Sequence, residues 1–284
     1  MRVPFPAAPG AVRFVIFAAP RTGSNLLCGL LNSHQSILCH HGLFNPDGVH
    51  YALDYRDGSL DFGSREERDR DPAAFLEKVW RSAHGRATVG FKFNHGEDER
   101  ALQLLTRDPL VRKILLSRGN RVRAYVSALE AAATGQWESY GAGDLLPDRR
   151  AVHVDPAGLW NFVNASDAFY ASLRESLSAT RQSFFSVDYE SLRSPVQMGR
   201  LLRFLDVRAC GLTLTAPSYK RGSQDLKDLV VNFAELAAAL RGCALEDELF
   251  RRDVTPISEV PIGQGTPGEV PLTRHGQQCH RYGT

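Results

Sequence analysis

Short apolar runs alternate with segments of helical periodicity along most of this chain. Apolar runs of a few residues, bounded by polar or turn-forming residues, predict buried strands. Apolar residues that recur at spacings of three and four predict helices. On this basis we expect strands at residues 14–18, 37–39, 88–95, 112–118 and 183–189. Helices are expected at residues 26–32, 72–83, 97–105, 122–133, 159–180, 195–205 and 225–240.

This alternation predicts an α/β fold, in which a P-loop-like, mainly parallel sheet has helices on both faces. One domain is expected over residues 1–250. Residues 252–284 carry four prolines and five glycines with little apolar periodicity, so we expect a Gly/Pro-rich C-terminal tail over 251–284. The mixed charge run at residues 65–71 predicts a solvated surface.

Charge and cysteine content exclude several classes of protein. The 34 basic and 32 acidic residues give a net charge of +2, which argues against a polybasic nucleic-acid binder. The five cysteines are scattered and form no CxxC pair, so neither a metal site nor a redox pair is expected. The start of the chain has no apolar signal region, and no apolar run is long enough to span a membrane. We therefore expect a reduced, cytoplasmic protein without a membrane span.

The stretch that connects the first strand to the first helix predicts an anion-binding loop. Residues 20–27 read PRTGSNLL: Pro20 ends the strand, Gly23 permits an unusual backbone conformation, and the leucines begin the helix. A strand, tight loop and helix in this order direct free backbone N–H groups at whatever occupies the loop. The alternative is a turn that only caps the helix.

The residues around Gly23 indicate which anion this loop is built for. Ser24 stands where a Walker A motif needs lysine, and the GxGxxG dinucleotide fingerprint is absent. A nucleoside-triphosphate kinase is therefore disfavoured. Arg21 is the only cation within the loop. This arrangement is similar to the 5′-phosphosulfate loop of sulfotransferases.

Four further stretches carry the same resemblance. Residues 115–120, LLSRGN, followed by Ser127, are similar to the family's 3′-phosphate motif. TGQW at 134–137 matches a segment that often follows, VDYESL at 187–192 resembles a late strand near the nucleotide, and residues 226–240 resemble the closing helix. Over residues 13–250 the chain resembles sulfotransferases that use 3′-phosphoadenosine-5′-phosphosulfate (PAPS), of the bacterial carbohydrate and lipopolysaccharide type with the trehalose and nodulation-factor enzymes.

The resemblance implies a sulfotransferase fold and the transfer of a sulfuryl group from PAPS to an acceptor hydroxyl, leaving 3′-phosphoadenosine-5′-phosphate (PAP) and needing no metal. A sugar or glycolipid acceptor is favoured; a small natural-product metabolite, or a PAP-binding protein without catalysis, are the alternatives. A homo-oligomer is compatible with the sequence. The nucleotide-binding residues that the resemblance implies are Arg21, Thr22, Gly23, Ser24, Asn25, Leu26, Arg118, Ser127 and Tyr189. Lys220 and Arg221 precede a predicted helix and are expected to close over the 3′-phosphate, with a solvated basic turn as the alternative.

The residue that takes the proton from the acceptor is less evident. Relatives often read HGELFN where residues 40–45 read HHGLFN, so Gly42 stands where their proposed catalytic glutamate lies. A histidine is a suitable general base near neutral pH, and we expect His41 first, with His40 and His95 next and a base elsewhere as the remaining alternative. Arg21 would stabilise the leaving phosphate, and Lys92, on the strand at 88–95, would assist. His40 and His41 are expected on a loop at the carboxyl edge of the sheet.

Overall fold

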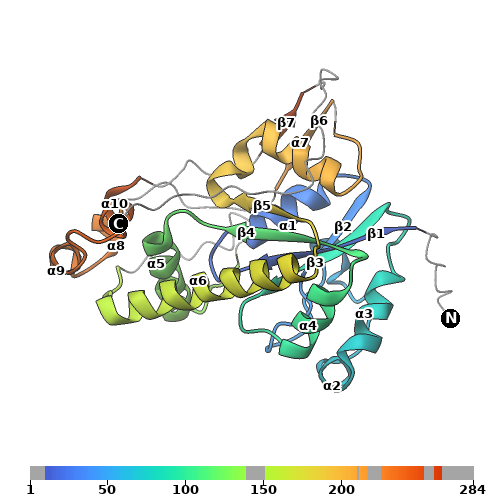
Figure 1. The fold of residues 1–284 in the computed structure, drawn as a ribbon, viewed down its shortest axis with the longest axis horizontal. Helices are drawn as coiled ribbons and strands as arrows, with labels where there is room; N and C mark the ends of the chain where they lie inside the picture. The colour runs from blue at the N-terminus through green and yellow to red at the C-terminus, as the bar shows by residue number, and fades with distance from the viewer. Residues whose placement is uncertain (1–9, 139–150, 210, 217–224, 253–258, 264–284) are drawn as a thin grey trace.

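A computed structural model describes the protein over residues 10–138, 151–209, 211–216, 225–252 and 259–263. Its centre is a parallel sheet of five strands in the order β2-β3-β1-β4-β5 (Figure 1). The predicted α/β class, with helices on both faces, is confirmed. The strands are β1 (Val12–Ala18), β2 (Ile37–Gly42), β3 (Thr88–Asn94), β4 (Val111–Ser117) and β5 (Phe184–Asp188).

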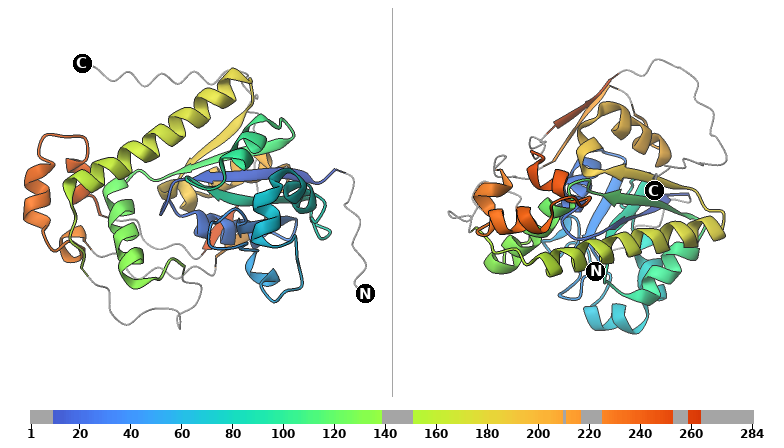
Figure 2. Two further views of the ribbon diagram at one scale, coloured as in Figure 1. Left: turned by 90° about the horizontal axis from the view of Figure 1, so that it is seen from below. Right: turned by 60° about the vertical axis from the view of Figure 1, so that its left-hand side comes forward.

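Alternating side chains of the central strand bury both faces of the sheet. Phe14 and Ile16 on β1 pack in one core with the helices α1 (Ser24–Asn32) and α7 (Pro195–Phe204). Val15 and Phe17 point to the other core, which α3 (Pro72–Trp80), α4 (Glu99–Arg107) and α6 (Pro156–Ala179) cover. Figure 2 shows these helices on the two sides of the sheet. Because β1 is buried on both faces, its sequence is a continuous apolar run.

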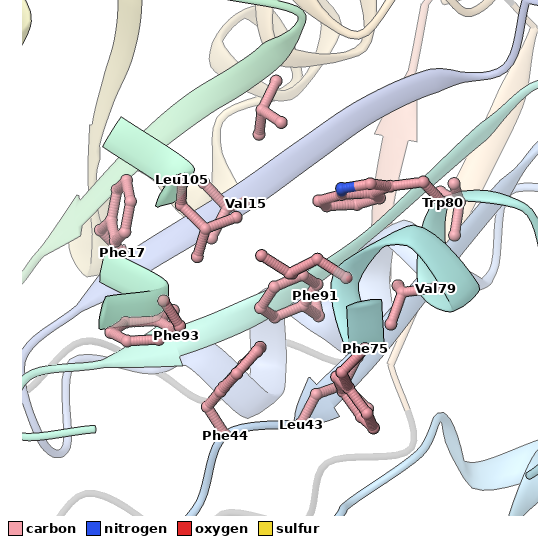
Figure 3. Close-up of a cluster of buried hydrophobic side chains, with 14 of the residues drawn as sticks. Val15, Phe17, Leu43, Phe44, Phe75, Val79, Trp80, Phe91, Phe93 and Leu105 are labelled. Carbon is pink, nitrogen blue, oxygen red and sulfur yellow. The ribbon is translucent and has the colours of Figure 1, made fainter. Parts of the chain in front are cut away.

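The core on the α3 side is rich in aromatic rings. Phe44 packs against Phe91 and Phe93 of β3, with ring centroids 5.8 and 5.7 Å apart, and Trp80 of α3 lies 5.6 Å from Phe91 (Figure 3). Such ring pairs stabilise a core beyond their buried area. Phe91 and Phe93 point into this core, so the intervening Lys92 is directed to the opposite face of β3, as the sequence predicts.

A group of helices packs at one end of the sheet. These are α5 (Arg121–Thr134), α8 (Leu226–Leu229), α9 (Phe233–Ala239) and α10 (Glu246–Phe250). The single helix predicted over 225–240 is wrong, because it is interrupted at Val230. There the backbone becomes extended and pairs with Val152: Val152 N donates to Leu229 O at 2.8 Å, and Val231 N donates to Val152 O at 2.9 Å.

Part of the expected C-terminal tail has regular structure. β7 (Glu259–Ile262) pairs antiparallel with β6 (Leu212–Thr215). Val260 and Ile262 are buried in the core beside α7, because alternate residues of a strand point to the same side. The tail expected over 251–284 therefore includes a strand, which the sequence did not predict. The rest of 253–284, apart from residue 263, lies outside the described residues.

The charge run at 65–71 is also not wholly solvated. It forms α2 (Arg65–Arg70), which begins with a capping box between Ser64 and Glu67. Arg68 is only 2% exposed, and its guanidinium donates hydrogen bonds to the carbonyl oxygens of Leu43, Asn45 and Gly48 at 2.9, 2.8 and 3.1 Å. This arginine fixes the loop that follows β2.

Candidate active site

The loop between β1 and α1 lies at the carboxyl edge of the sheet. Gly23 is the N-cap of α1 with φ of 90°, and Arg21 also has a positive φ, of 63°. A Cβ on Gly23 would lie 2.4 Å from Cδ2 of the buried Tyr189 ring, so only glycine fits here. The Thr22 hydroxyl donates to Ala19 O at 2.8 Å. The first turn of α1 thus presents its backbone N–H groups toward the loop, as an anion site requires.

Arg21 joins the two motifs that the sequence assigns to the nucleotide. Its Nε donates to Ser127 Oγ on α5 at 3.0 Å, and its Nη1 donates to the carbonyl oxygen of Trp137 at 2.7 Å. Arg118, which follows β4, donates from Nη1 to the carbonyl oxygen of Arg21 at 3.0 Å. Its guanidinium also lies over the Tyr189 ring, 4.6 Å from the centroid. Two cations therefore converge on one turn of backbone, which favours an anionic ligand.

The other expected nucleotide residues are placed as follows. Ser24 and Asn25 begin α1, while the Leu26 side chain is buried in the core, so that only its backbone is available to a ligand. Tyr189 begins the short helix η3 (Tyr189–Arg193) and packs against the loop. Lys220 and Arg221 lie outside the described residues.

Two hollows flank this loop. The first, of about 330 Å³, is lined by Thr22 and Arg118 together with residues of α5 and α6. The second, of about 490 Å³, lies toward β2 and β3 and is called here the acceptor hollow. The residues that line the acceptor hollow are Gly42, Asn45, Asp47, His50, Lys92, Thr134, Gly135, Gln136, Trp137 and Glu138.

Lys92 connects the acceptor hollow with the anion-binding loop. It is 8% exposed, and its Nζ donates a hydrogen bond to Asn25 Oδ1 at the start of α1. Glu138 reaches the same point: its Oε1 lies 3.3 Å from Asn25 Nδ2 and 3.9 Å from Lys92 Nζ. The other oxygen, Oε2, accepts from Arg56 at 3.1 Å. Burial acts to raise the pKa of Glu138, but the charges of Lys92 and Arg56 outweigh it and lower that pKa.

The three histidines considered as the base lie in different surroundings. His40 and His41 belong to β2, not to a loop as expected, because the pairing of β2 with β3 continues to Gly42. The pairing register shifts between His40 and Gly42, and the two rings have different neighbours. His40 is fully buried among the rings of Tyr51, Tyr55 and Phe62, and its Nδ1 accepts from the backbone of Ala52.

His41 points toward the loop. Its Nδ1 is 3.4 Å from Asn25 Oδ1 and 3.9 Å from Glu138 Oε1, and the side chain is 1% exposed. Burial lowers the pKa of His41 to about 3, helped by the charge of Lys92. The ring of His95 packs against Phe169 with a centroid separation of 4.8 Å, and His95 does not line the acceptor hollow.

A second carboxyl lies behind the wall of the acceptor hollow. Oε1 of Glu97 accepts from Asn94 Nδ2 at 2.8 Å and is 3.6 Å from where a Cβ on Gly42 would stand. Its Oε2 is buried and has no hydrogen-bond partner within the described residues. Burial raises the pKa of Glu97 to about 7. The Glu97 carboxyl therefore borders the space that a side chain at position 42 would occupy.

Known proteins resemble this chain over most of its length. No protein-family model matches it. It is 25% identical over 240 residues to nodulation protein H of Rhizobium tropici, which covers 82% of this chain and 91% of the relative. It is 28% identical over 228 residues to nodulation protein H of Rhizobium meliloti strain 1021, which covers 78% of this chain and 89% of the relative.

The chain resembles nodulation protein H along about four-fifths of its length. This similarity confirms the predicted resemblance to proteins of the nodulation-factor type.

Sequence patterns did not single out Asn45, Asp47, His50 and Glu138 of the acceptor hollow, or Arg56 at its border. Glu138 directly follows the TGQW segment that the resemblance singled out, and this adjacency is the signal that would have found it. Within the described residues, no group of three or more histidine, cysteine, aspartate or glutamate side chains is arranged to hold a metal ion. The helices of the described part are also too short or too polar to cross a membrane.

Proposed function

We propose that this chain is a PAPS-dependent sulfotransferase that transfers a sulfuryl group to the hydroxyl of a sugar or glycolipid. The observation that carries the proposal is the convergence of Arg21, Ser127 and Arg118 on the turn before α1. Arg21 contacts Ser127, 106 positions later in the chain, and Arg118, 97 positions later. These residues belong to the two stretches that resemble the family's phosphate motifs. The nodulation protein H relatives support the same activity.

The residues of the loop fit a ligand with charge at both ends. The backbone N–H groups of residues 23–25 and the Arg21 guanidinium face the 5′ end, and Arg118 with Ser127 serves the 3′-phosphate. Charge-assisted hydrogen bonds from arginine are the strong ones for such groups. The neighbouring hollow lined by Thr22 and Arg118 accommodates part of the nucleotide, and Tyr189 keeps the loop in position through Gly23.

PAPS supplies an activated sulfuryl group whose leaving group is a phosphate. The chain contributes positioning and electrostatic stabilisation, as in phosphoryl transfer. Arg21 and the α1 N-terminus stabilise charge that develops on the 5′-phosphate. Lys92, held by Asn25, places a second cation beside the reacting centre.

The acceptor hollow suits a saccharide. Trp137 is 52% exposed and offers a flat apolar face at the wall of a hollow that is otherwise lined by amide, imidazole, ammonium and carboxylate groups. A sugar ring has an apolar C–H face and a polar rim, and an amphipathic aromatic side chain suits both. A small natural-product metabolite remains the second candidate acceptor.

The chain acts in the cytoplasm, in keeping with the free thiols of Cys28, Cys39 and Cys243.

Two measurements separate this proposal from its alternatives. Calorimetry compares the affinities for PAP and ATP, and transfer from labelled PAPS is then assayed with trehalose, a chitooligosaccharide, phenol and 4-nitrophenol. A sulfotransferase binds PAP more tightly than ATP and labels at least one acceptor. PAP binding without transfer would indicate a nucleotide-binding protein without catalysis, and tighter binding of ATP would indicate a kinase.

A further inference from the structure

Gly42 and Glu138 line the same acceptor hollow. Gly42 brings no side chain to it, at the position where the sulfotransferases that this chain resembles often have a glutamate. Glu138 brings a carboxylate from a different segment, the turn after α5. The hollow therefore has a carboxylate on its wall that comes from a segment other than β2.

The Glu138 carboxylate is held where the acceptor hollow meets the anion-binding loop. One oxygen lies beside Asn25 Nδ2 and Lys92 Nζ, at 3.3 and 3.9 Å, and the other accepts from Arg56 at 3.1 Å. The backbone of its own segment is tied to the loop, since Trp137 O accepts from Arg21 at 2.7 Å. The side chain is 28% exposed, so an acceptor in the hollow has access to it.

We infer that Glu138 is the general base of this enzyme, an inference that rests on the proposed sulfuryl transfer. In that step the acceptor oxygen forms a bond to sulfur while the bond from sulfur to the 5′-phosphate oxygen breaks. The electron pair of the broken bond stays on the phosphate of PAP. The hydroxyl proton passes to the Glu138 carboxylate.

The charges around Glu138 keep it ready to accept that proton. Lys92 and Arg56 lower its pKa against the effect of burial, so the carboxylate is ionised at neutral pH. His41 and His50 also lie near it, and burial lowers the pKa of each. Both imidazoles are therefore neutral above pH 7, so the positive charge beside the Glu138 carboxylate comes from Lys92 and Arg56.

The competing candidates are less well placed. His41 is 1% exposed and does not line the acceptor hollow. The pKa of Glu97 is well suited to a base, but its carboxyl lies behind Gly42, and its Oε2 is sealed from solvent. A general base must come within hydrogen-bond reach of the proton that it removes, and among these three only Glu138 is on the wall of the hollow.

The test exploits the acidity of the acceptor. Glu138→Gln keeps the shape of the side chain and removes the basic oxygen. With trehalose, a chitooligosaccharide or phenol we expect kcat to fall roughly a hundredfold, the usual contribution of a general base. With 4-nitrophenol, which ionises without help near neutral pH, the loss is expected to shrink to a few-fold. PAP affinity, measured by calorimetry, stays unchanged, and Glu138→Asp recovers part of the rate.

Glu97→Gln is the discriminating variant, and Glu175→Gln, on the exposed side of α6, is the matched control. If Glu138→Gln retains its rate with the weakly acidic acceptors, or loses the same factor with 4-nitrophenol as with phenol, Glu138 is not the base. A loss confined to Glu97→Gln that disappears with 4-nitrophenol would move the role to Glu97. A wild-type chain that labels no acceptor would instead refute the proposed function, which distinguishes the two failures.

Discussion

The Arg21 guanidinium donates a hydrogen bond to the Ser127 hydroxyl, 3.0 Å away and 106 positions later in the chain. This contact connects the loop after the central strand β1 with the middle of α5. It joins the loop proposed to bind the 5′-phosphate of the nucleotide to the helix proposed to bind its 3′-phosphate. The parallel order of β1 and β4 makes the contact possible, because both strands end at the same edge of the sheet.

Arg118→Ala tests the 3′-phosphate end. We expect PAP binding to weaken by about 2 kcal/mol or more, the scale for a lost charge-assisted hydrogen bond. Calorimetry with PAP measures it, and Arg107→Ala, on the exposed end of α4, is the control that should bind PAP normally. An affinity for PAP that is equal in both variants would remove Arg118 from the site.

Gly23→Ala tests the geometry of the loop. The added Cβ would lie 2.4 Å from the Tyr189 ring at a backbone φ of 90°. We expect the free energy of unfolding to fall by about 1–3 kcal/mol and PAP affinity to fall with it. Gly85→Ala is a matched control at φ of 76° with no atom near the added Cβ; it should lose stability without a loss of PAP affinity. Equal behaviour of the two variants would contradict the role of the contact with Tyr189.

The buried carboxyl of Glu97 gives stability a pH dependence of known sign. Its pKa is raised from 4.5 to about 7 by burial, so the folded chain holds a proton there that the unfolded chain has released. The stabilising effect is full below about pH 4.5 and is lost as pH rises toward 7 and above.

Urea unfolding between pH 4.5 and 7.5 measures this effect as the difference between wild type and Glu97→Gln. The wild type should lose about 1–3 kcal/mol relative to the variant as pH rises. Parallel stability curves for the two proteins would show that Glu97 has an ordinary pKa.

The strands and the anion-binding loop could be predicted because their signals are local. A continuous apolar run marks a strand buried on both faces, and PRTGSNLL contains the turn and the helix start within eight residues. The pairing of Arg118 with Ser127 could also be predicted from their spacing, because both residues follow the same strand. These features depend on short-range backbone chemistry and on alternation.

The remaining features depend on contacts between distant segments. Arg68 is buried because three carbonyl groups of the loop after β2 surround its guanidinium, which a charge run cannot indicate. Val230 leaves the helix because Val152 offers it a backbone partner. Glu138 comes close to Lys92 because distant segments pack together, which the sequence does not indicate. The sequence instead indicated the histidines nearest to Gly42 as candidate bases.

Arg21 offers the most direct test of sulfuryl transfer at this loop. The turnover of labelled PAPS and the affinity for PAP are measured together for wild type and Arg21→Ala. We predict that the wild type labels a hydroxyl acceptor. We also predict that Arg21→Ala loses far more in turnover than in PAP affinity, because the role proposed for Arg21 is at the reacting end. A wild-type chain that binds PAP without transfer, or equal losses in turnover and affinity for Arg21→Ala, would contradict this account.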